Sequence, residues 1–324
     1  MAHRLKNKWI WDLWLALDGH DYHAFYLQAS KALGDPELRH RNVSIGHAVS
    51  QDLHSWETLP DALYPSSEDG AWDDFTTWTG SVIRHEGLWY MFYAGGKRDE
   101  NALLQRIGYA VSKDLIHWDR HPDGPVIHHD PQRYELFDPE VWHDHTWRDP
   151  WVMWNSSTDL FYAFITARVK VGPKDGRGVV ALARSVDLRE WQVLDPVTPS
   201  GDFGYMEVPQ VIHIGSMYYL IFSTVKAFHS EARQSRSDTH PETGIHYLVA
   251  EALTGPYRYL TGTFLLGDSV GKHYGGKIVK DPGGNLALLP MCYLDEDGEF
   301  VGEMGDPISV KVASNGMLVL EESR

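Results

Sequence analysis

Three acidic residues stand isolated in runs of apolar and aromatic residues, where charged side chains are uncommon. Asp12 lies in the run WIWDLWLA, Asp149 in TWRDPWVMW and Glu207 in GYMEVPQV. A single acid of this kind often holds neighbouring loops together through hydrogen bonds. Three of them, close in sequence to Trp11 and Trp147, are costly to bury as a group, which favours a functional cluster over a structural role.

Carboxylates that converge in a pocket walled by aromatic rings suit the cleavage of glycosidic bonds. One carboxylate attacks the anomeric carbon or activates a water molecule, and another protonates the departing oxygen. The third can bind sugar hydroxyls and stabilise the positive charge of the transition state. A spacing of about 5–5.5 Å between the two reacting carboxylates favours retention, and about 6.5–9.5 Å favours inversion. The residues alone leave both outcomes open.

Two patterns repeat along the chain and predict the elements that carry these acids. The first is an apolar run followed by a polar turn and a tryptophan. It occurs as IGHAVSQDLHSWE (45–57), IGYAVSKDLIHWD (107–119) and VALARSVDLREWQ (180–192), with a weaker copy at 245–258. The second pattern is a short run rich in aromatic and β-branched residues, which is typical of strands. It occurs at 21–29, 87–95, 159–167, 216–224 and 285–293.

A further predicted strand precedes each copy of the second pattern. These strands lie at 9–16, 77–83, 147–154, 206–214 and 273–280. The 324 residues therefore divide into repeated units of roughly sixty to seventy residues, a period that indicates stacked β-units. We predict an all-β fold, a five-bladed β-propeller, whose last blade is completed by residues 306–321. No linker or change of composition divides the chain, so we expect a single catalytic domain over residues 1–324.

The first strand of each propeller blade lines the central axis, so matching residues on these strands meet at one end of the channel. Asp12, Asp149 and Glu207 are predicted to occupy matching points in blades one, three and four. The other two blades are expected to place Gly80–Ser81 and Gly275–Gly276 there. These residues are small enough to leave room for a ligand between the acids.

The composition narrows the possible partners. The chain has 29 Lys and Arg against 45 Asp and Glu, a formal net charge of −16, which disfavours nucleic acids and anionic lipid surfaces. No apolar run approaches the ~20 residues that cross a bilayer, and because the N-terminal residues show no apolar stretch followed by a small-residue cleavage site, we expect no secretion signal. A single cysteine, Cys292, excludes an internal disulfide and fits a reducing compartment. We expect a cytoplasmic protein with a carbohydrate partner, no nucleic acid or membrane partner, and no cofactor.

Five short motifs resemble, in the same order over most of the chain, those of glycoside hydrolase clan J, families 32 and 68. WDLW (11–14) resembles the nucleophile motif of the family 68 levansucrases and inulosucrases. IGHAVSQDLHSW (45–56) resembles a first-blade segment of the family 32 invertases and fructanases. TWTGS (77–81), WRDP (147–150) and EVP (207–209) are similar to the Trp-Ser-Gly-Ser, Arg-Asp-Pro and Glu-Cys-Pro or Glu-Arg-Pro motifs. Both families are five-bladed propellers, which agrees with the repeat count.

The resemblance implies a role for each matching residue. Asp12 would be the nucleophile that forms a covalent fructosyl-enzyme, Glu207 the general acid/base, and Asp149 the residue that holds the furanose 3- and 4-hydroxyls. Arg148 would bind the sugar or Glu207. The other expected substrate-binding residues are Trp11, Trp14, Gln28, Trp78, Thr79, Ser81 and His273. The implied activity is retaining hydrolysis of β-fructofuranosides, such as fructan, fructooligosaccharides or sucrose.

Three alternatives remain open. A fructosyltransferase would use the same carboxylates and pass the sugar to another sugar hydroxyl, including one on the same substrate molecule. An arabinofuranosidase-like enzyme would invert the anomeric centre and would need the wider carboxylate spacing. A catalytically inactive sugar-binding propeller would bind glycans without turnover. The order and completeness of the three acids favour an enzyme.

Several polar regions lie outside these motifs. YGGK (274–277) could bring Tyr274 or Lys277 to the pocket, where Lys277 would suit a phosphorylated sugar. VIHHDP and WHDHTW are rich in histidine but lack zinc-like spacing, so we expect no metal, although His143 or His145 could line the pocket rim. The polar stretch 228–244 could form a lid or contact a second copy, which leaves a homo-oligomer open.

Overall fold

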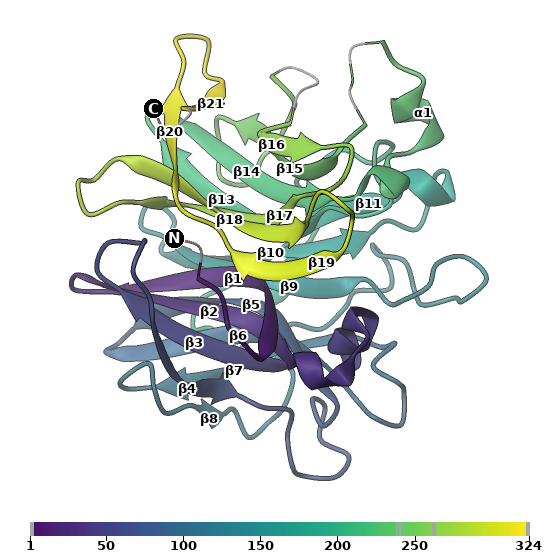
Figure 1. The fold of residues 1–324 in the computed structure, drawn as a ribbon. Helices are drawn as coiled ribbons and strands as arrows, with labels where there is room; N and C mark the ends of the chain where they lie inside the picture. Colours follow the sequence, from purple (N-terminus) through teal and green to yellow (C-terminus); the bar gives the residue numbers. More distant parts are fainter. Residues whose placement is uncertain (1–2, 238, 240, 261–263, 322–324) are drawn as a thin grey trace.

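Consecutive antiparallel strands form five sheets that fan around a common axis (Figure 1). The computed structural model describes residues 3–237, 239, 241–260 and 264–321. Blades one and two, coloured purple to blue, lie on one side in Figure 1, and blades four and five, coloured green to yellow, lie on the other, with β9 and β10 between them. The predicted all-β five-bladed propeller is confirmed.

Each blade follows the same strand order from the axis outward. The innermost strands are β1 (Lys8–Asp18), β5 (Thr76–His85), β9 (Trp147–Asn155), β13 (Glu207–Ile214) and β17 (His273–Lys280). The second strands are β2 (Asp21–Ser30), β6 (Leu88–Gly96), β10 (Leu160–Arg168), β14 (Met217–Thr224) and β18 (Leu286–Leu294). Next come β3 (Ser44–Ser50), β7 (Arg106–Ser112), β11 (Gly178–Ser185), β15 (Thr243–Ala250) and β20 (Ile308–Val312). The outermost strands are β4 (Glu57–Leu63), β8 (Asp119–Arg120), β12 (Gln192–Leu194), β16 (Leu266–Asp268) and β21 (Leu318–Leu320).

Helical structure is confined to short segments between strands. They are η1 (Lys31–Leu33), η2 (Pro36–Arg41), η3 (Lys174–Gly176), η4 (Lys226–Phe228) and α1 (Glu231–Gln234). In the described part of the chain, no helix is long and apolar enough to span a bilayer. The segment η2 matters for the site, because it follows β2 and reaches the end of the axis where the acids lie.

The hydrophobic core is divided among the spaces between neighbouring blades. The cluster between blades one and two contains Trp14 and Met91, and the next contains Phe92 and Phe161. Equivalent clusters lie between blades three and four, four and five, and five and one. Because each blade is apolar on both faces, its strands read as nearly continuous apolar runs. The isolated acids of the innermost strands therefore stand out in the sequence.

Blade five and the N-terminus close the ring. Strand β19 (Phe300–Met304) pairs with β18 beside β20, and its residue Met304 exchanges backbone hydrogen bonds with His3. Strand β1 also packs against β17 and β19. Residues 306–321 supply β20 and β21, so the prediction that this segment completes the last blade is confirmed.

The repeated tryptophan pattern forms a turn after the third strand in blades one, two and three. In the first copy, Asp52 accepts hydrogen bonds from the backbone N–H groups of His54 and Ser55. Leu53 adopts a φ of +65° and is buried, and its carbonyl accepts from Trp56 Nε1 at 3.1 Å. The copies built on Asp114 and Asp187 repeat these contacts. The pattern is therefore a structural turn, and its residues do not line the pocket at the end of the axis.

Every innermost strand also contains an irregularity in its pairing, at nearly the same height. The register shifts occur at Asp12 in β1, at Trp78–Thr79 in β5, at Asp149–Pro150 in β9, at Val208–Pro209 in β13 and at Gly275–Gly276 in β17. Such bulges re-aim side chains and are common beside active sites. The ring of five bulges therefore marks the functional end of the axis.

These bulges correct two details of the expected alignment. Glu207 lies one residue before the bulge of its strand, whereas Asp12 and Asp149 lie within theirs. In blade two the bulge is formed by Trp78–Thr79, so Gly80–Ser81 does not occupy the predicted matching point. The prediction for Gly275–Gly276 agrees with the structure.

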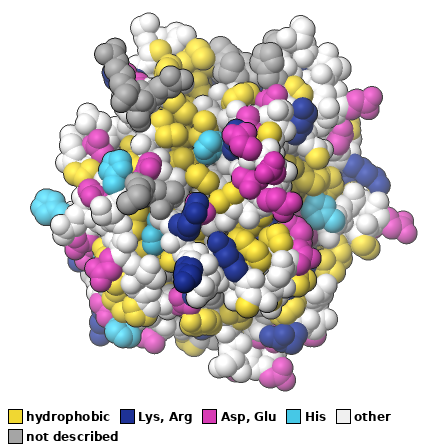
Figure 2. Space-filling view, in the orientation of Figure 1, with side chains coloured by type: hydrophobic (Ala, Val, Ile, Leu, Met, Phe, Trp, Pro, Cys, Tyr) yellow, Lys and Arg dark blue, Asp and Glu magenta, His cyan; other side chains and the backbone are white. Residues whose placement is uncertain are grey.

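Acidic side chains are spread over the face seen in Figure 2, in keeping with the net charge of −16. The stretch 228–244 lies beside residues 201–204, where Arg233 pairs with Asp202 at 3.1 Å and Gly204 donates its backbone N–H to Phe228. Residues 238 and 240 of this stretch lie outside the described residues. The stretch therefore packs against the segment that leads into blade four. Its role as a lid or subunit contact stays a prediction.

Candidate active site

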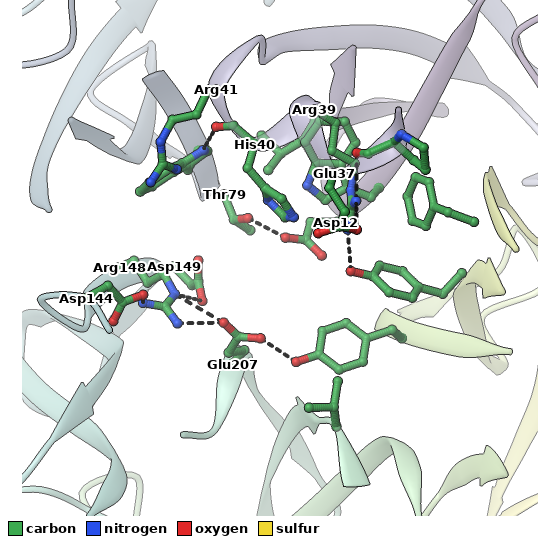
Figure 3. A pocket seen from close by; sticks show the side chains of 18 of the residues that line it. Asp12, Glu37, Arg39, His40, Arg41, Thr79, Asp144, Arg148, Asp149 and Glu207 are labelled. Carbon is green, nitrogen blue, oxygen red and sulfur yellow. Dashed lines mark hydrogen bonds and ion pairs between the residues drawn. The ribbon is translucent and has the colours of Figure 1, made fainter. Parts of the chain in front are cut away.

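A pocket of about 790 Å³ opens at the end of the axis where the bulges lie. Its volume falls within the range of about 300–1,000 Å³ that is common for small-molecule sites. The three predicted carboxylates Asp12, Asp149 and Glu207 all line it. Figure 3 shows Asp12 approaching from one side of the pocket and Glu207, held by Arg148, from the other. Residues far apart in the sequence thus meet as predicted.

One carboxylate oxygen of Asp12 accepts a hydrogen bond, and the other lies close to the backbone of a glycine. Its Oδ2 accepts a hydrogen bond from Thr79 Oγ1 at 2.7 Å. A Cβ added at Gly275 would lie 2.9 Å from Oδ1, and Gly275 has a φ of +67°. Both the close approach and the left-handed conformation favour glycine there. Asp12 itself adopts a φ of +42°, a strained conformation of the kind found at functional sites.

Asp149 is the most buried of the three acids. It is 5% exposed, and its Oδ2 accepts from Thr166 Oγ1 at 2.9 Å and from the backbone N–H of Val208 at 3.1 Å. Its φ is +56°, like that of Asp12. These contacts fix one oxygen from the protein side, while the residue lines the pocket.

Glu207 is bound by donors from two blades. Arg148 Nη2 lies 2.6 Å and Nε 3.2 Å from Glu207 Oε1, and the hydroxyl of Tyr274 donates to Oε2. Arg148 is itself held, because its Nη1 donates to Gln105 Oε1 at 3.0 Å and to Asp144 Oδ2 at 3.1 Å. The guanidinium therefore orients Glu207 from a fixed position.

Burial and mutual repulsion shift the ionisation of the acids. Burial raises the pKa of Asp12 to about 7, with the charge of Asp149 acting in the same direction and the Thr79 hydrogen bond opposing it. Burial also raises the pKa of Asp149 to about 6, with the charge of Arg148 opposing it. Such shifts are typical of groups that take part in catalysis at near-neutral pH.

The segment η2 covers one side of the pocket and was not predicted as part of the site. Arg39, His40 and Arg41 all line the pocket and lie above Asp12 in Figure 3. Arg39 is 2% exposed, donates to Tyr293 Oη at 2.8 Å and lies over the ring of Phe300. Burial lowers the pKa of His40 to about 4, so the positive charge on this side comes from the two arginines.

Of the predicted substrate-binding residues, four line the pocket. Trp11, Trp78, Thr79 and Arg148 are brought together with the three acids. Trp78 is fixed by a hydrogen bond from its Nε1 to the carbonyl of His40 at 3.1 Å. The two tryptophans thus form part of the wall of the pocket, beside Asp12.

The other four do not line it. Trp14 is fully buried between blades one and two, where it stacks on Phe25. Ser81 links β5 to β9, because it donates to the carbonyl of Pro150 and accepts from the backbone N–H of Val152. Both lie further along their strands than the pocket-lining residues Thr79 and Asp12, on the far side of the bulges.

Gln28 and His273 do not line the pocket, although in each case a neighbouring residue of the same strand does. Gln28 is 1% exposed and donates to Ser44 Oγ at 3.1 Å, while its neighbour Leu27 lines the pocket. His273 precedes Tyr274, which also lines the pocket. Successive residues of a strand point to opposite faces, so the geometry does not support substrate contact by Gln28 or His273.

Several residues that line the pocket were not predicted from the sequence. Besides the segment η2, they include Gln105, Asp144, Tyr205, Tyr293, Glu299 and Phe300. They lie between repeated strands or at strand ends, where no periodic pattern marks them. Of the YGGK motif, Tyr274 lines the pocket and Lys277 does not.

The histidine-rich segments divide between pocket and core. His143 lines the pocket, whereas His145 is buried and its ring centroid lies 4.4 Å from that of His129. Among the residues that the structure describes, no group of three or more His, Cys, Asp and Glu side chains is placed to hold a metal ion.

Sequence comparisons place these features in a family. The model of the glycosyl hydrolases family 32 N-terminal domain matches residues 14–240. The chain is 31% identical to the sucrose-6-phosphate hydrolase of Escherichia coli over 213 residues, which cover 62% of this chain and 38% of that protein. It is 28% identical to an insoluble β-fructofuranosidase isoenzyme of Arabidopsis thaliana over 177 residues, covering 52% of this chain and 26% of that protein. The chain thus spans about a third of the length of the curated relatives that it matches.

Solved structures agree on the fold over nearly the whole chain. An inulosucrase from Halalkalicoccus jeotgali superposes with a TM-score of 0.79 at 20% identity, covering 98% of this chain and 87% of that one. A Bombyx mori family 32 β-fructofuranosidase gives a TM-score of 0.72 at 19% identity, covering 99% and 64%. At these identities the likeness concerns the fold alone. The family match includes Asp149 and Glu207 and begins two residues after Asp12, and on its extent the chain belongs to glycosyl hydrolase family 32.

Proposed function

We propose that this protein is a retaining glycoside hydrolase that cleaves β-fructofuranosides through a covalent fructosyl-enzyme. The observation that carries the proposal is the convergence of Asp12, Asp149 and Glu207 on one pocket at the end of the propeller axis. Each acid has at least one oxygen fixed by a protein donor. Preorganisation of this kind lowers the cost of reaching the transition state.

In the first step, an Asp12 oxygen attacks C2 of the fructosyl unit and the bond from C2 to the glycosidic oxygen breaks. Glu207 donates a proton to that oxygen, which leaves as an alcohol. Thr79 fixes Asp12 Oδ2, and the absence of a side chain at Gly275 leaves space at Oδ1. The products of this step are a fructosyl ester on Asp12 and the released aglycone.

In the second step, Glu207 accepts a proton from a water molecule, and the water oxygen attacks C2. The ester bond breaks, Asp12 regains its negative charge and fructose leaves with the original anomeric configuration. Arg148 keeps Glu207 oriented through both steps by its two contacts to Oε1. Glu207 thus acts first as an acid and then as a base.

Asp149 and the tryptophans would bind the sugar. The Asp149 oxygen that is not held by Thr166 and Val208 is available to accept from ring hydroxyls. A negative carboxylate beside the bound sugar would also stabilise positive charge that develops on the ring. Trp11 and Trp78 offer apolar faces on which a sugar ring can pack.

A substrate screen tests the proposal. The protein is incubated with sucrose, inulin- and levan-type oligosaccharides and aryl arabinofuranosides, and the products are identified by chromatography. The expected result is release of fructose from at least one fructofuranoside, with initial retention of configuration by NMR. Cleavage of arabinofuranosides alone, or initial inversion, would contradict the proposal.

The same intermediate can be intercepted by a sugar hydroxyl, which would make the protein a fructosyltransferase. Product analysis at rising substrate concentration separates the two activities. Hydrolysis gives free fructose in equal amount to the aglycone at every concentration. A growing shortfall of fructose, matched by longer oligosaccharides, would identify transfer as the main reaction.

A phosphorylated fructofuranoside is a second candidate substrate, favoured by Arg41. This residue lines the pocket, lies over the ring of Trp78, and its buried Nε has no hydrogen-bond acceptor in the described part of the chain. A guanidinium that lines the pocket suits a phosphate group, because its planar set of N–H donors matches phosphate oxygens. Two matched bacterial proteins are sucrose-6-phosphate hydrolases.

The Arg41→Gln variant tests this second candidate. If the guanidinium binds the phosphate, kcat/KM for sucrose 6-phosphate falls by about 10- to 100-fold, while that for sucrose changes little. Lys6, which is exposed, provides a matched control as Lys6→Gln. Equal effects of Arg41→Gln on both substrates would rule out a phosphate-binding role.

A further inference from the structure

Lys277 is a buried cation on the innermost strand of blade five. It is 2% exposed and lies two residues after Gly275, the residue that packs against Asp12. The residue also borders a second, mainly apolar cavity of about 320 Å³, together with Leu15, Ile212 and Ile278. A charged ammonium in such surroundings is costly unless nearby groups compensate it.

The ammonium is fixed by the bulge of the neighbouring strand. Lys277 Nζ donates to the carbonyl of Val208 at 2.6 Å, and the N–H of Val208 donates to Asp149 Oδ2 at 3.1 Å. Val208 has a φ of +48° and directly follows Glu207. One bulge residue is thus held by Lys277 on its carbonyl side and by Asp149 on its amide side.

The compensating charges lie in the acidic cluster. The charges of Asp12 and Asp149 oppose the effect of burial, which lowers the pKa of Lys277 to about 8. Lys277 in turn favours the ionised form of Asp12. The other groups that act on the two acids are Thr79 on β5, Arg148 on β9, Thr166 on β10, and Glu207 and the Val208 amide on β13. Of these, Arg148 is engaged with Glu207 and Asp144.

We propose that Lys277 is a positioning residue whose buried ammonium, anchored on the Val208 carbonyl, favours the ionised form of Asp12 for the reaction. It acts from behind the bulges and does not line the substrate pocket. The inference rests on the proposed function for its consequence in catalysis. The electrostatic coupling itself can be measured without any substrate.

The Lys277→Met variant removes the charge and retains much of the side-chain volume. Aspartate carboxylates labelled with ¹³C are titrated by NMR, and the Asp12 signal is assigned by its loss in Asp12→Asn. The titration midpoint of Asp12 is expected to rise by at least about one pH unit in Lys277→Met. For the active substrate, the acid limb of kcat/KM should move upward by a similar amount.

Lys280→Met is the matched control, because Lys280 lies on the same strand and is exposed. It should leave both the titration and the pH profile unchanged. An unshifted Asp12 midpoint in Lys277→Met, or equal shifts in both variants, would overturn the proposal. A shifted midpoint in a protein that cleaves no fructofuranoside would instead refute the proposed function and leave the coupling intact.

A reciprocal measurement covers the case in which Lys277→Met does not fold. The titration of Lys277 is followed through its ¹³Cε signal in the unmodified protein and in Asp12→Asn. Coupling between two sites is mutual, so loss of the Asp12 charge must lower the Lys277 midpoint, by about one pH unit or more if the coupling is as strong as proposed. An unchanged Lys277 midpoint would refute the proposal by itself.

Discussion

The aspartates of the axis and those of the outer turns experience opposite environments within the same blades. Asp12 and Asp149 lie beside other acids in a largely desolvated pocket, and their pKa values are raised. Asp52 and Asp114 lie at the surface, where hydrogen bonds from backbone N–H groups, led by those of Ser55 and His117, hold their pKa values well below the usual range. The carboxylates of the outer turns therefore stabilise the fold, whereas the ionised carboxylates at the axis reduce its stability.

Both regions place a non-glycine residue in the left-handed conformation, but for different ends. In the outer turns the residue is a leucine, Leu53 or Leu115, whose side chain is buried in the core. At the axis it is Asp12 or Asp149, and the carboxylate is directed toward a pocket. Strain is offset by apolar burial in the first case, whereas in the second it coincides with buried charge. Features that reduce stability in this way are typical of functional sites.

The largest difference between the two regions should appear in activity. Asp12→Asn removes the nucleophile and keeps a residue that tolerates a positive φ, so kcat is expected to fall by at least about 10⁴-fold. Asp52→Asn makes the same chemical change in an outer turn and should retain near-normal kcat. Steady-state kinetics on one fructofuranoside compare the variants, with circular dichroism to confirm folding. If Asp12→Asn is about as active as Asp52→Asn, Asp12 is not the nucleophile and the two aspartates do not differ in function.

The next effect concerns the acid/base group of the axis. Glu207→Gln should lower kcat by about 10²- to 10⁴-fold for sucrose, the range for loss of a general acid. The loss should be smaller for a fructofuranoside with an activated aryl leaving group, because that group needs no proton to depart. Parallel kinetics on the two substrates provide the check. Equal losses on both would assign Glu207 a binding role.

The smallest effect is on stability. The contributions of the two regions to the free energy of unfolding should change with pH in opposite directions. Asp12 has a raised pKa in the folded state, so its contribution to stability is greatest at low pH and is lost as pH rises from about 4 to about 7. At pH 8, Asp12→Asn should therefore be more stable than the parent by at least about 1 kcal/mol. At pH 4 the difference should shrink.

Asp52 should show the reverse dependence. Its folded pKa is depressed, so its contribution is present above pH ~4 and is lost as pH falls. Asp52→Ala should lower stability at pH 7 by about 0.5–1 kcal/mol, the range for loss of a side-chain cap, and by less at pH 3. Urea unfolding of Asp12→Asn and Asp52→Ala at several pH values measures both dependences. Slopes of the same sign would show that the two environments are not opposed.

The blade count and the three acids could be predicted because both leave clear marks in the sequence. The turn pattern built on Asp52 recurs at Asp114 and Asp187, and the strands between the copies are nearly all apolar. An acid inside such a strand has no place in a core, so Asp12, Asp149 and Glu207 could be selected individually.

The detailed lining of the pocket could not be predicted, because it depends on the bulges. A shift of one residue turns a side chain to the opposite face of a strand. Ser81 and Trp14 were expected at the site, but the bulges at Trp78–Thr79 and Asp12 turn them into contacts between blades. The segment η2, with Arg39 and Arg41, follows no repeat and gave no signal.

The most direct test of the account is to trap the intermediate and locate it. The protein is mixed with an activated aryl fructofuranoside, quenched with acid and digested, and the peptides are analysed by mass spectrometry, using Glu207→Gln to slow breakdown of the ester. The account predicts a single hexosyl adduct on the peptide that carries Asp12, absent in Asp12→Asn. An adduct on Asp149 or on Glu207 of the unmodified protein, or turnover with retention and no adduct on any acid, would contradict it.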